Sequence, residues 1–508
     1  MQFNAINLYI PFFCGENKRM TNYPGLMGRR IAGIGVFALF AASSLLGDAP
    51  RNPMHNHSAW SLFETARDNG HRLAPISLPA GLEKPEGVSV ILCDPAKRFQ
   101  VIDGFGGAFT ESTGWVLAQL PEERRAAILR AYFDPKDGLG YNLCRTHINS
   151  CDFSLGSWSL DDTPGDVALR DFNLAPMRKW VLPAIHAAQA VPGASFRILA
   201  SPWSPPAWMK TNGKMTNGGT IKPELRDVWA RFLAEFVRRM KSEEGIVVWG
   251  LTVQNEPAAN QVWESCLYTA EEERDFVRDH LGPVLKTAGL ENVRLMILDH
   301  NRDILFERSS TVLSDPKAAQ YVWGTALHWY VSEEFGVSSR LHDAFPDKNL
   351  LFTEGCWEGG VKLAKWDRGE RYARNIIGDL NNWVRGWIDW NMVLDITGGP
   401  NHVGNLCDAP VLADLKTGEV YFQSSFYALG HFSKFIRPGA QRIGVSGGPG
   451  ELQVTAFENL DGAIAVVVFN ETDAQKRFGL KIGTGGTLDC VIPAHAIQTY
   501  LNGGDAQK

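Results

Sequence analysis

The sequence, 508 residues long, lacks the features that would place it in several common protein classes. Its eight cysteines form no CxxC pair and no cluster with histidine at zinc-ligand spacing, so the common zinc motifs are excluded and the redox compartment stays open. It has no run of lysine and arginine and a formal net charge of -6, which argues against nucleic acid as a partner. Low-complexity tracts are also absent, and a chain of this length can bury a large core without disulfides or a metal.

A long apolar run occurs once, near the N-terminus, at residues 31–46. It follows Arg29 and Arg30, and it is shorter than the roughly 20 residues that a membrane-spanning helix needs. A basic segment, a short apolar segment and the small residues behind it together indicate an export signal. We therefore interpret residues 1–50 as a presequence with a signal peptide that starts at Met27, and we expect a secreted or periplasmic protein. An uncleaved membrane anchor is the alternative.

Between residues 101 and 435, short apolar runs alternate with amphipathic stretches. Segment 226–241, for example, repeats its apolar residues with the period of a helix. The strand-like runs are 101–103, 142–145, 196–200, 248–253, 293–298, 324–328, 350–353 and 386–390. Eight strands with helices between them predict a (β/α)8 TIM barrel, a fold of the α/β class, over residues 101–435.

The pattern changes after residue 435. Apolar runs at 452–457, 464–469 and 497–501 are separated by Gly, Asn and Asp turns, which is typical of antiparallel strands. Segment 72–100 has the same character. We therefore predict an antiparallel β side domain built from both ends of the mature chain, 72–100 and 436–503.

Polar or aromatic residues follow directly after the strand-like runs, where the active sites of barrel enzymes lie. Glu256 stands in an Asn-Glu-Pro segment after the fourth run, and Glu354 follows the seventh. Two carboxyls across a pocket are what a glycosidase uses to protonate the leaving oxygen and to attack the sugar or activate water. Asp103 and Asp299 also follow strand-like runs, but no motif supports Asp299, and we leave it out of the candidate site.

The chain resembles glycoside hydrolase family 30, in its glucosylceramidase-like branch. The matching stretches, in chain order, are VIDGFGGAFTES (101–112), SCDFS (150–154), ASPWSPPAWMKTNG (200–213), TVQNEP (252–257), YTAEEERDFVRDHLGP (268–283), LHWY (327–330), FTEGCW (352–357), WIDWNMVLDITGGPNHVGN (387–405) and ALGHFSKFIRPGAQRI (428–443). The resemblance implies a barrel with a β side domain and a retaining double displacement through a covalent glycosyl-enzyme. Glu256 is then the acid/base and Glu354 the nucleophile, with no metal or cofactor. Glu358, in the same segment as Glu354, is the alternative nucleophile.

The resemblance also implies a set of substrate-binding residues. Asn255 matches the residue that holds the sugar 2-hydroxyl. The positions that match the glucose subsite are Asp152, Trp203, Trp390 and Asn401, and those that match the surroundings of the nucleophile are Arg145, His328 and Tyr330. Trp329, between the last two, completes the candidate substrate-binding set.

The two glutamates are expected to differ in protonation. Retention requires the carboxyls to lie about 5 Å apart. At that separation one negative charge raises the pKa of the other group, so we expect Glu256 to be protonated and Glu354 to be ionised. Once Glu354 is esterified its charge disappears, and Glu256 can deprotonate the incoming water.

The substrate implied by the resemblance is a β-glucoside, with glucosylceramide-type lipids favoured and transient contact with a membrane surface as a consequence. Sixteen tryptophans, more than the twelve histidines, suit a site that stacks on sugar rings. An endo-β-1,6-glucanase or a β-xylosidase of the same family is the alternative. Outside the enzymes, a non-catalytic carbohydrate-binding barrel is the competing hypothesis, but such a module has no need for two unpaired buried carboxyls.

Overall fold

The structure is a computed structural model, and it describes residues 60–78 and 87–503. The predicted presequence and its signal peptide lie outside these residues. Within them, no helix is long and apolar enough to cross a membrane.

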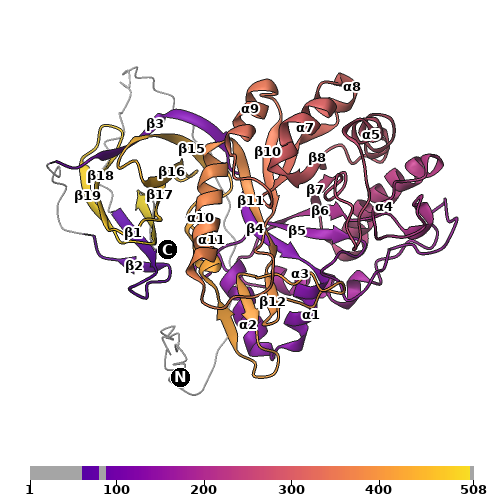
Figure 1. Cartoon of the computed structure of the whole chain (residues 1–508), viewed down its shortest axis with the longest axis horizontal. Coiled ribbons are helices and arrows are strands. Elements are labelled where there is room, and N and C mark those ends of the chain that lie inside the picture. Colours follow the sequence, from indigo (N-terminus) through magenta and orange to yellow (C-terminus); the bar gives the residue numbers. More distant parts are fainter. Residues whose placement is uncertain (1–59, 79–86, 504–508) are drawn as a thin grey trace, which may run out of the picture. The chain divides into compact units, whose positions relative to one another are not determined.

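Eight parallel strands close into a barrel in the order β10-β11-β4-β5-β6-β7-β8-β9 (Figure 1). They are β4 (Gly104–Phe109), β5 (Leu143–Ile148), β6 (Arg197–Pro202), β7 (Val248–Thr252), β8 (Arg294–Asn301), β9 (Val322–His328), β10 (Asn349–Glu354) and β11 (Val384–Asn391). Side chains from six of these strands form one buried cluster, Leu143, Leu199, Met296, Ala326, Leu351 and Ile388. Such a cluster is what fills the interior of a TIM barrel, and the predicted (β/α)8 fold is confirmed.

Helices connect the barrel strands. They are α1 (Glu111–Gln119), α2 (Glu122–Phe133), α3 (Val181–Gln189), α4 (Arg226–Glu244), α5 (Ala270–Phe276), α6 (Gly282–Thr287), α7 (Leu305–Leu313), α8 (Pro316–Ala319), α9 (Gly336–Ala344) and α10 (Trp366–Asn381), and α11 (Ser424–Ser433) follows the barrel. Helix α4 illustrates why such segments form helices against the barrel: Trp229, Phe232 and Phe236 recur with the helical period and are buried on one face. It ends at Gly245, whose left-handed φ of 68° terminates the helix.

The first barrel strand corrects the prediction made for residues 101–103. Val101 ends β3 (Val90–Val101) of the side sheet, and the glycine-rich segment β4 takes the barrel position instead. Asp103 therefore lies at the N-terminal end of the barrel, away from the mouth. There it accepts hydrogen bonds from Arg294 (2.8 Å) and Arg385 (2.7 Å).

The side domain is a nine-stranded sheet in the order β19-β18-β3-β15-β16-β17-β20-β1-β2 (Figure 1). Its strands are β1 (Trp60–Ala66), β2 (Ala74–Ile76), β3, β15 (Gln441–Gly447), β16 (Leu452–Glu458), β17 (Ile464–Asn470), β18 (Lys476–Ile482), β19 (Thr487–Ile492) and β20 (Ala496–Asn502). Every pair is antiparallel except β3 with β18. Both chain ends contribute, as predicted, but β1 lies before residue 72, where the sequence analysis begins the domain. A smaller sheet, β12 (Val393–Asp395), β13 (Val411–Ala413) and β14 (Val420–Phe422), follows the last barrel strand.

Candidate active site

Glu256 is held at the carboxyl end of β7 by the neighbouring strands. Its backbone N–H donates to Asp299 O (2.9 Å), and the N–H of Asn255 donates to Pro202 O (2.8 Å). The φ of Glu256 is 46°, a left-handed conformation that costs about 1–3 kcal/mol for a non-glycine residue. The bonds to β6 and β8 hold this turn in place, so the direction of the Glu256 side chain is set by the barrel.

Glu354 is the last residue of β10, and its carboxyl is buried among donors. Arg145 Nη1 on β5 donates to its Oε2 (2.5 Å), and the Tyr330 hydroxyl donates to its Oε1 (3.0 Å). Arg145 also donates to Asn255 Oδ1 (2.9 Å). Of the three residues predicted around Glu354, Arg145 and Tyr330 therefore donate to it directly, and they fix the positions of its carboxylate oxygens.

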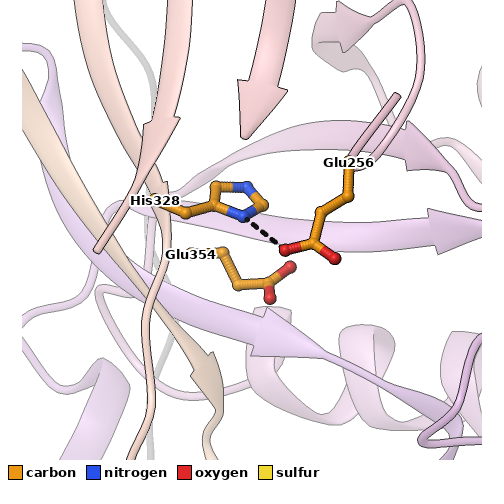
Figure 2. Close-up of side chains that lie close together, drawn as sticks. All are labelled: Glu256, His328 and Glu354. Carbon is orange, nitrogen blue, oxygen red and sulfur yellow. Dashed lines mark ion pairs between the residues drawn. The ribbon is translucent and has the colours of Figure 1, made fainter. Parts of the chain in front are cut away.

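The two glutamates face each other across the barrel mouth (Figure 2). One carboxylate oxygen of Glu256, one of Glu354 and a ring nitrogen of His328 all lie within 4.8 Å of one another. His328 Nδ1 lies 3.5 Å from Glu256 Oε1, the ion pair drawn in Figure 2. Oxygens this close fit the roughly 5 Å separation of the two carboxyls in retaining glycosidases.

Asp299, which sequence reasoning left out, lies at the centre of the polar network. Its oxygens accept from Arg145 (2.7 Å), Thr252 (2.7 Å), Thr353 (2.7 Å) and His328 Nε2 (3.0 Å). Burial would raise the pKa of Asp299, but the charges of Arg145 and His328 outweigh it and hold the pKa well below the usual range. The only signal available in the sequence was its place behind a strand-like run, which it shares with Glu256 and Glu354.

The surroundings of the pair shift the pKa values of Glu256, Glu354 and His328 in different directions. Burial lowers the pKa of His328, but Glu354, Asp299 and Glu256 together raise it to about 9. Burial also raises the pKa of Glu256, but the facing His328 outweighs this and lowers it. The pKa of Glu354 is raised, by burial first, against the opposing charges of His328 and Arg145. A charge on His328 therefore favours the carboxylate form of the adjacent Glu256 in the free enzyme, and the expectation that Glu256 itself holds the proton stays a prediction.

A cavity opens above the pair. It is lined by Asp152, Phe153, Glu256, Gln261, Trp263, His300, Asn301, Tyr330, Glu354, Cys356, Glu358, Trp390, Asn405 and Cys407. Trp390 stacks on Trp203 behind it, with ring centroids 5.1 Å apart and planes 17° apart. Trp390 therefore presents a flat apolar face to the cavity, and Trp203 supports it from behind.

Asp152 lies on the cavity floor and is paired with two amides. Its Oδ2 accepts from Asn405 Nδ2 (3.1 Å) and from Asn401 Nδ2 (3.3 Å). Burial, and then the charge of Glu354, raise the pKa of Asp152 to about 8. Asn405 lines the cavity, and Asn401 contacts it through the carboxylate of Asp152. Asn401 Oδ1 also accepts the backbone N–H of Asn405 (3.0 Å), so Asn401 helps to hold the turn that carries Asn405. The sequence analysis did not identify Asn405 as a site residue.

Trp329 was predicted to bind substrate, but its side chain lies outside the cavity. Its side chain is fully buried and packs against Tyr372 and Trp387, with centroid distances of 4.8 and 5.4 Å. Its indole N–H donates to Cys356 O (3.2 Å). Trp329 follows His328 directly, and successive residues leaving a strand point to opposite sides, so it faces the barrel's outer core and not the cavity.

Glu256, His328 and Glu354 are also the group of possible metal ligands found in the described part of the chain. Arg145 already donates to Glu354, and the raised pKa of His328 makes it a cation beside Glu256. Two positive charges at the ligand atoms oppose a third, so these residues fit acid/base chemistry better than a metal ion.

A parallel eight-stranded barrel with two close carboxyls at the ends of its fourth and seventh strands defines a glycoside hydrolase of the barrel type. The model of the glycosyl hydrolase family 30 TIM-barrel domain matches residues 102–436, and that of the family 30 beta sandwich domain matches residues 439–500. The chain belongs to glycoside hydrolase family 30.

Several relatives are similar over most of the chain. The lysosomal acid glucosylceramidase of Mus musculus is 36% identical over 461 residues, which cover 87% of this chain and 88% of that protein. The endo-1,6-beta-D-glucanase of Neurospora crassa is 31% identical over 86% of this chain and 94% of its own length. The crystal structure of SrfJ from Salmonella typhimurium matches with a TM-score of 0.83 and 32% identity, over 88% of this chain and all of that one.

Proposed function

We propose that this glycoside hydrolase cleaves β-glucosides with retention, with Glu354 as the nucleophile and Glu256 as the acid/base. The observation that carries the proposal is the approach of the two carboxylates and His328 to within 4.8 Å at the barrel mouth. The glucose ring lies against Trp390, with its hydroxyls toward Asp152 and Asn405, and Asn255 beside the 2-hydroxyl.

In the first step Glu354 attacks the anomeric carbon while the glycosidic bond breaks. Arg145 and Tyr330 hold the attacking carboxylate in place. Bound sugar excludes water from Glu256, which raises its pKa, and the proton on His328 Nδ1 passes to Glu256 and on to the leaving oxygen. The sugar is then an ester of Glu354, and the aglycone leaves as an alcohol.

In the second step water replaces the aglycone. The ester has no charge, so the electrostatic balance around Glu256 changes and its carboxylate takes a proton from the water. The hydroxide formed attacks the anomeric carbon, the bond to Glu354 breaks, and glucose leaves with its original β configuration. The proton taken up by Glu256 then passes back to His328, which restores the starting state.

A glucosyl-lipid of the glucosylceramide type is the favoured substrate. The similarity to the mouse glucosylceramidase supports it. So does a set of exposed aliphatic side chains, Leu155, Val262, Val331, Leu363 and Ile396, which lie on segments that follow β5, β7, β9, β10 and β11. In a barrel these segments all meet at the mouth, where apolar groups can contact a membrane surface transiently. Export through the presequence would bring the enzyme to such substrates.

A β-1,6-glucan is the second candidate, favoured by the similarity to the Neurospora crassa glucanase. Both candidates use the same catalytic pair, because they differ only in the aglycone. The polar residues Gln261 and Asn301 at the cavity wall could serve the hydroxyls of either.

The test compares the mature enzyme with Glu354→Gln and Glu256→Gln on nitrophenyl β-glucoside, nitrophenyl β-xyloside, glucosylceramide and β-1,6-glucan. Glu354→Gln should lower kcat by about 10³-fold or more on every substrate, since it removes the nucleophile. Glu256→Gln should lose most activity on glucosylceramide and less on the activated aryl glucoside, whose leaving group needs little protonation. Cleavage of the glucan alone would overturn the lipid assignment, and cleavage of the xyloside alone would overturn the glucoside specificity. Turnover that persists in Glu354→Gln would overturn the mechanism.

A further inference from the structure

Besides Asp152, a further carboxyl, that of Glu358, lines the same cavity as the catalytic pair. It lies in the segment between β10 and α10, four positions beyond Glu354 in the sequence. A backbone bridge between Glu358 and Cys407 fixes this segment against the loop that carries Asn405. The Glu358 side chain is exposed at the mouth, whereas Asp152 on the floor is only 4% exposed.

The carboxylate of Glu358 is not engaged elsewhere. In residues 60–78 and 87–503, its side chain makes no hydrogen bond and no ion pair, unlike the carboxylates of Asp152, Asp299 and Glu354. Its pKa is raised by partial burial, then by the negative charges of Glu256 and Glu354, against the more distant Arg371. The negative charge of an unpaired carboxylate near two others is electrostatically unfavourable in the free enzyme. A hydrogen-bond donor on a bound ligand would relieve this repulsion.

The two additional acidic groups, Asp152 and Glu358, lie at different depths in the cavity. Asp152 is buried and accepts hydrogen bonds from Asn401 and Asn405, so the proposed glucose site beside it is the buried end of the cavity. Glu358 is exposed and lies at the open end. Glu256 delivers its proton to the oxygen that leaves with the aglycone. The mouth beside Glu256 is therefore where the aglycone lies.

We propose that Glu358 forms part of the aglycone subsite and selects leaving groups that carry hydroxyl or cationic hydrogen-bond donors, while it disfavours anionic ones. This rests on the proposed β-glucosidase function and extends it to the second half of the substrate. A donor on the aglycone forms a hydrogen bond with the unpaired carboxylate of Glu358. An anionic aglycone is repelled by the same carboxylate, and the repulsion is strengthened because the cavity is partly desolvated.

The experiment uses three phenyl β-glucosides that differ at the para position, with methyl, aminomethyl and carboxymethyl groups. The methylene spacers keep the leaving groups similar while the charge changes. We compare the ratio of kcat/KM for the cationic and anionic substrates between the wild-type enzyme, Glu358→Gln and the control Glu291→Gln. Glu291 is exposed on the segment before β8, at the opposite end of the barrel, so its substitution changes net charge equally.

We expect Glu358→Gln to lower this ratio roughly tenfold, mainly through KM of the charged substrates, with the methyl substrate changed less than about twofold. Glu291→Gln should leave the ratio unchanged, and added salt should shrink the wild-type ratio. An equal ratio in wild type and Glu358→Gln would overturn the proposal. So would an equal loss on all three substrates, because Glu358 would then act on the catalytic pair. No hydrolysis of any β-glucoside by the wild type would instead overturn the proposed function.

Discussion

The buried charges at the barrel mouth form a balanced set. Asp299 and Glu354 are anionic, Arg145 is cationic, and His328 carries a proton because carboxylates surround it. A buried charge is tolerated when its partners remain, and removal of one partner leaves the others uncompensated. Asp299 touches no substrate in the proposed mechanism, but it determines the charge of His328 and so acts as a positioning residue.

We predict that Asp299→Asn shifts the alkaline limb of the pH profile of kcat/KM to lower pH. Asp299 helps to raise the pKa of His328 to about 9, and loss of its charge lowers that pKa, by about one unit or more. His328 then loses its proton at a lower pH, and the supply of protons to Glu256 fails earlier as pH rises. The pH profile on an aryl β-glucoside measures this. Asp303→Asn, at an exposed position two residues beyond the end of β8, should keep the wild-type profile. An unshifted limb in Asp299→Asn would contradict the role given to His328.

At the scale of the elements, β4 shows how close packing closes the barrel. It lies between β11 and β5, and glycines replace the apolar side chains expected of a buried strand. A Cβ at Gly106 would lie 2.0 Å from Leu143 O on β5, and one at Gly386 would lie 2.5 Å from Gly104 O. Neighbouring backbones therefore occupy the space of side chains, which only glycine allows.

Gly106→Ala should destabilise the fold by about 3 kcal/mol or prevent its formation, because the added methyl group must displace the backbone of β5. Gly156→Ala is the matched control, since a Cβ there would meet nothing within 4 Å and its φ is not left-handed. Chemical denaturation of both variants measures the difference in free energy of unfolding. Equal stability of the two variants would show that β5 can move aside.

At the scale of the molecule, α11 joins the barrel to the side sheet through one histidine. His431 is fully buried, with Nδ1 2.8 Å from Thr499 Oγ1 on β20 and Nε2 2.9 Å from Thr65 Oγ1 on β1. The two threonines come from opposite ends of the chain. Burial lowers the pKa of His431 to about 3, so the imidazole of the folded protein is uncharged near neutral pH.

This gives the stability of the protein a defined dependence on pH. Between pH 6.5 and 3 the unfolded chain takes up a proton at His431 and the folded chain does not, so stability falls as pH falls. From pH 7 to pH 5 the loss from this residue is about 2 kcal/mol. His431→Gln keeps a hydrogen-bonding side chain without the titration and should lose that much less stability over the same interval. Denaturant unfolding at both pH values measures this, and parallel losses in the two proteins would refute it.

The predictable parts of the site were those with local signals. Glu256 and Glu354 were found because each follows a strand-like run and lies in a recognisable segment, and Arg145 and Tyr330 took the expected places beside Glu354. Trp329 was placed wrongly among the substrate-binding residues, because its position between His328 and Tyr330 in the chain does not determine which way its side chain points.

The sequence by itself determined the barrel, the side domain built from both chain ends, and the family. Apolar periodicity and the short motifs around the catalytic residues are local signals, because each depends only on residues that are close together in the chain. Only the tertiary structure decided which residues meet. Asp299 became the centre of the network, Asn405 joined Asn401 as a partner of Asp152, and His328 came to lie beside Glu256. Each of these depends on distances between side chains from different strands, and electrostatic and hydrogen-bond energies depend on those distances and not on spacing along the chain.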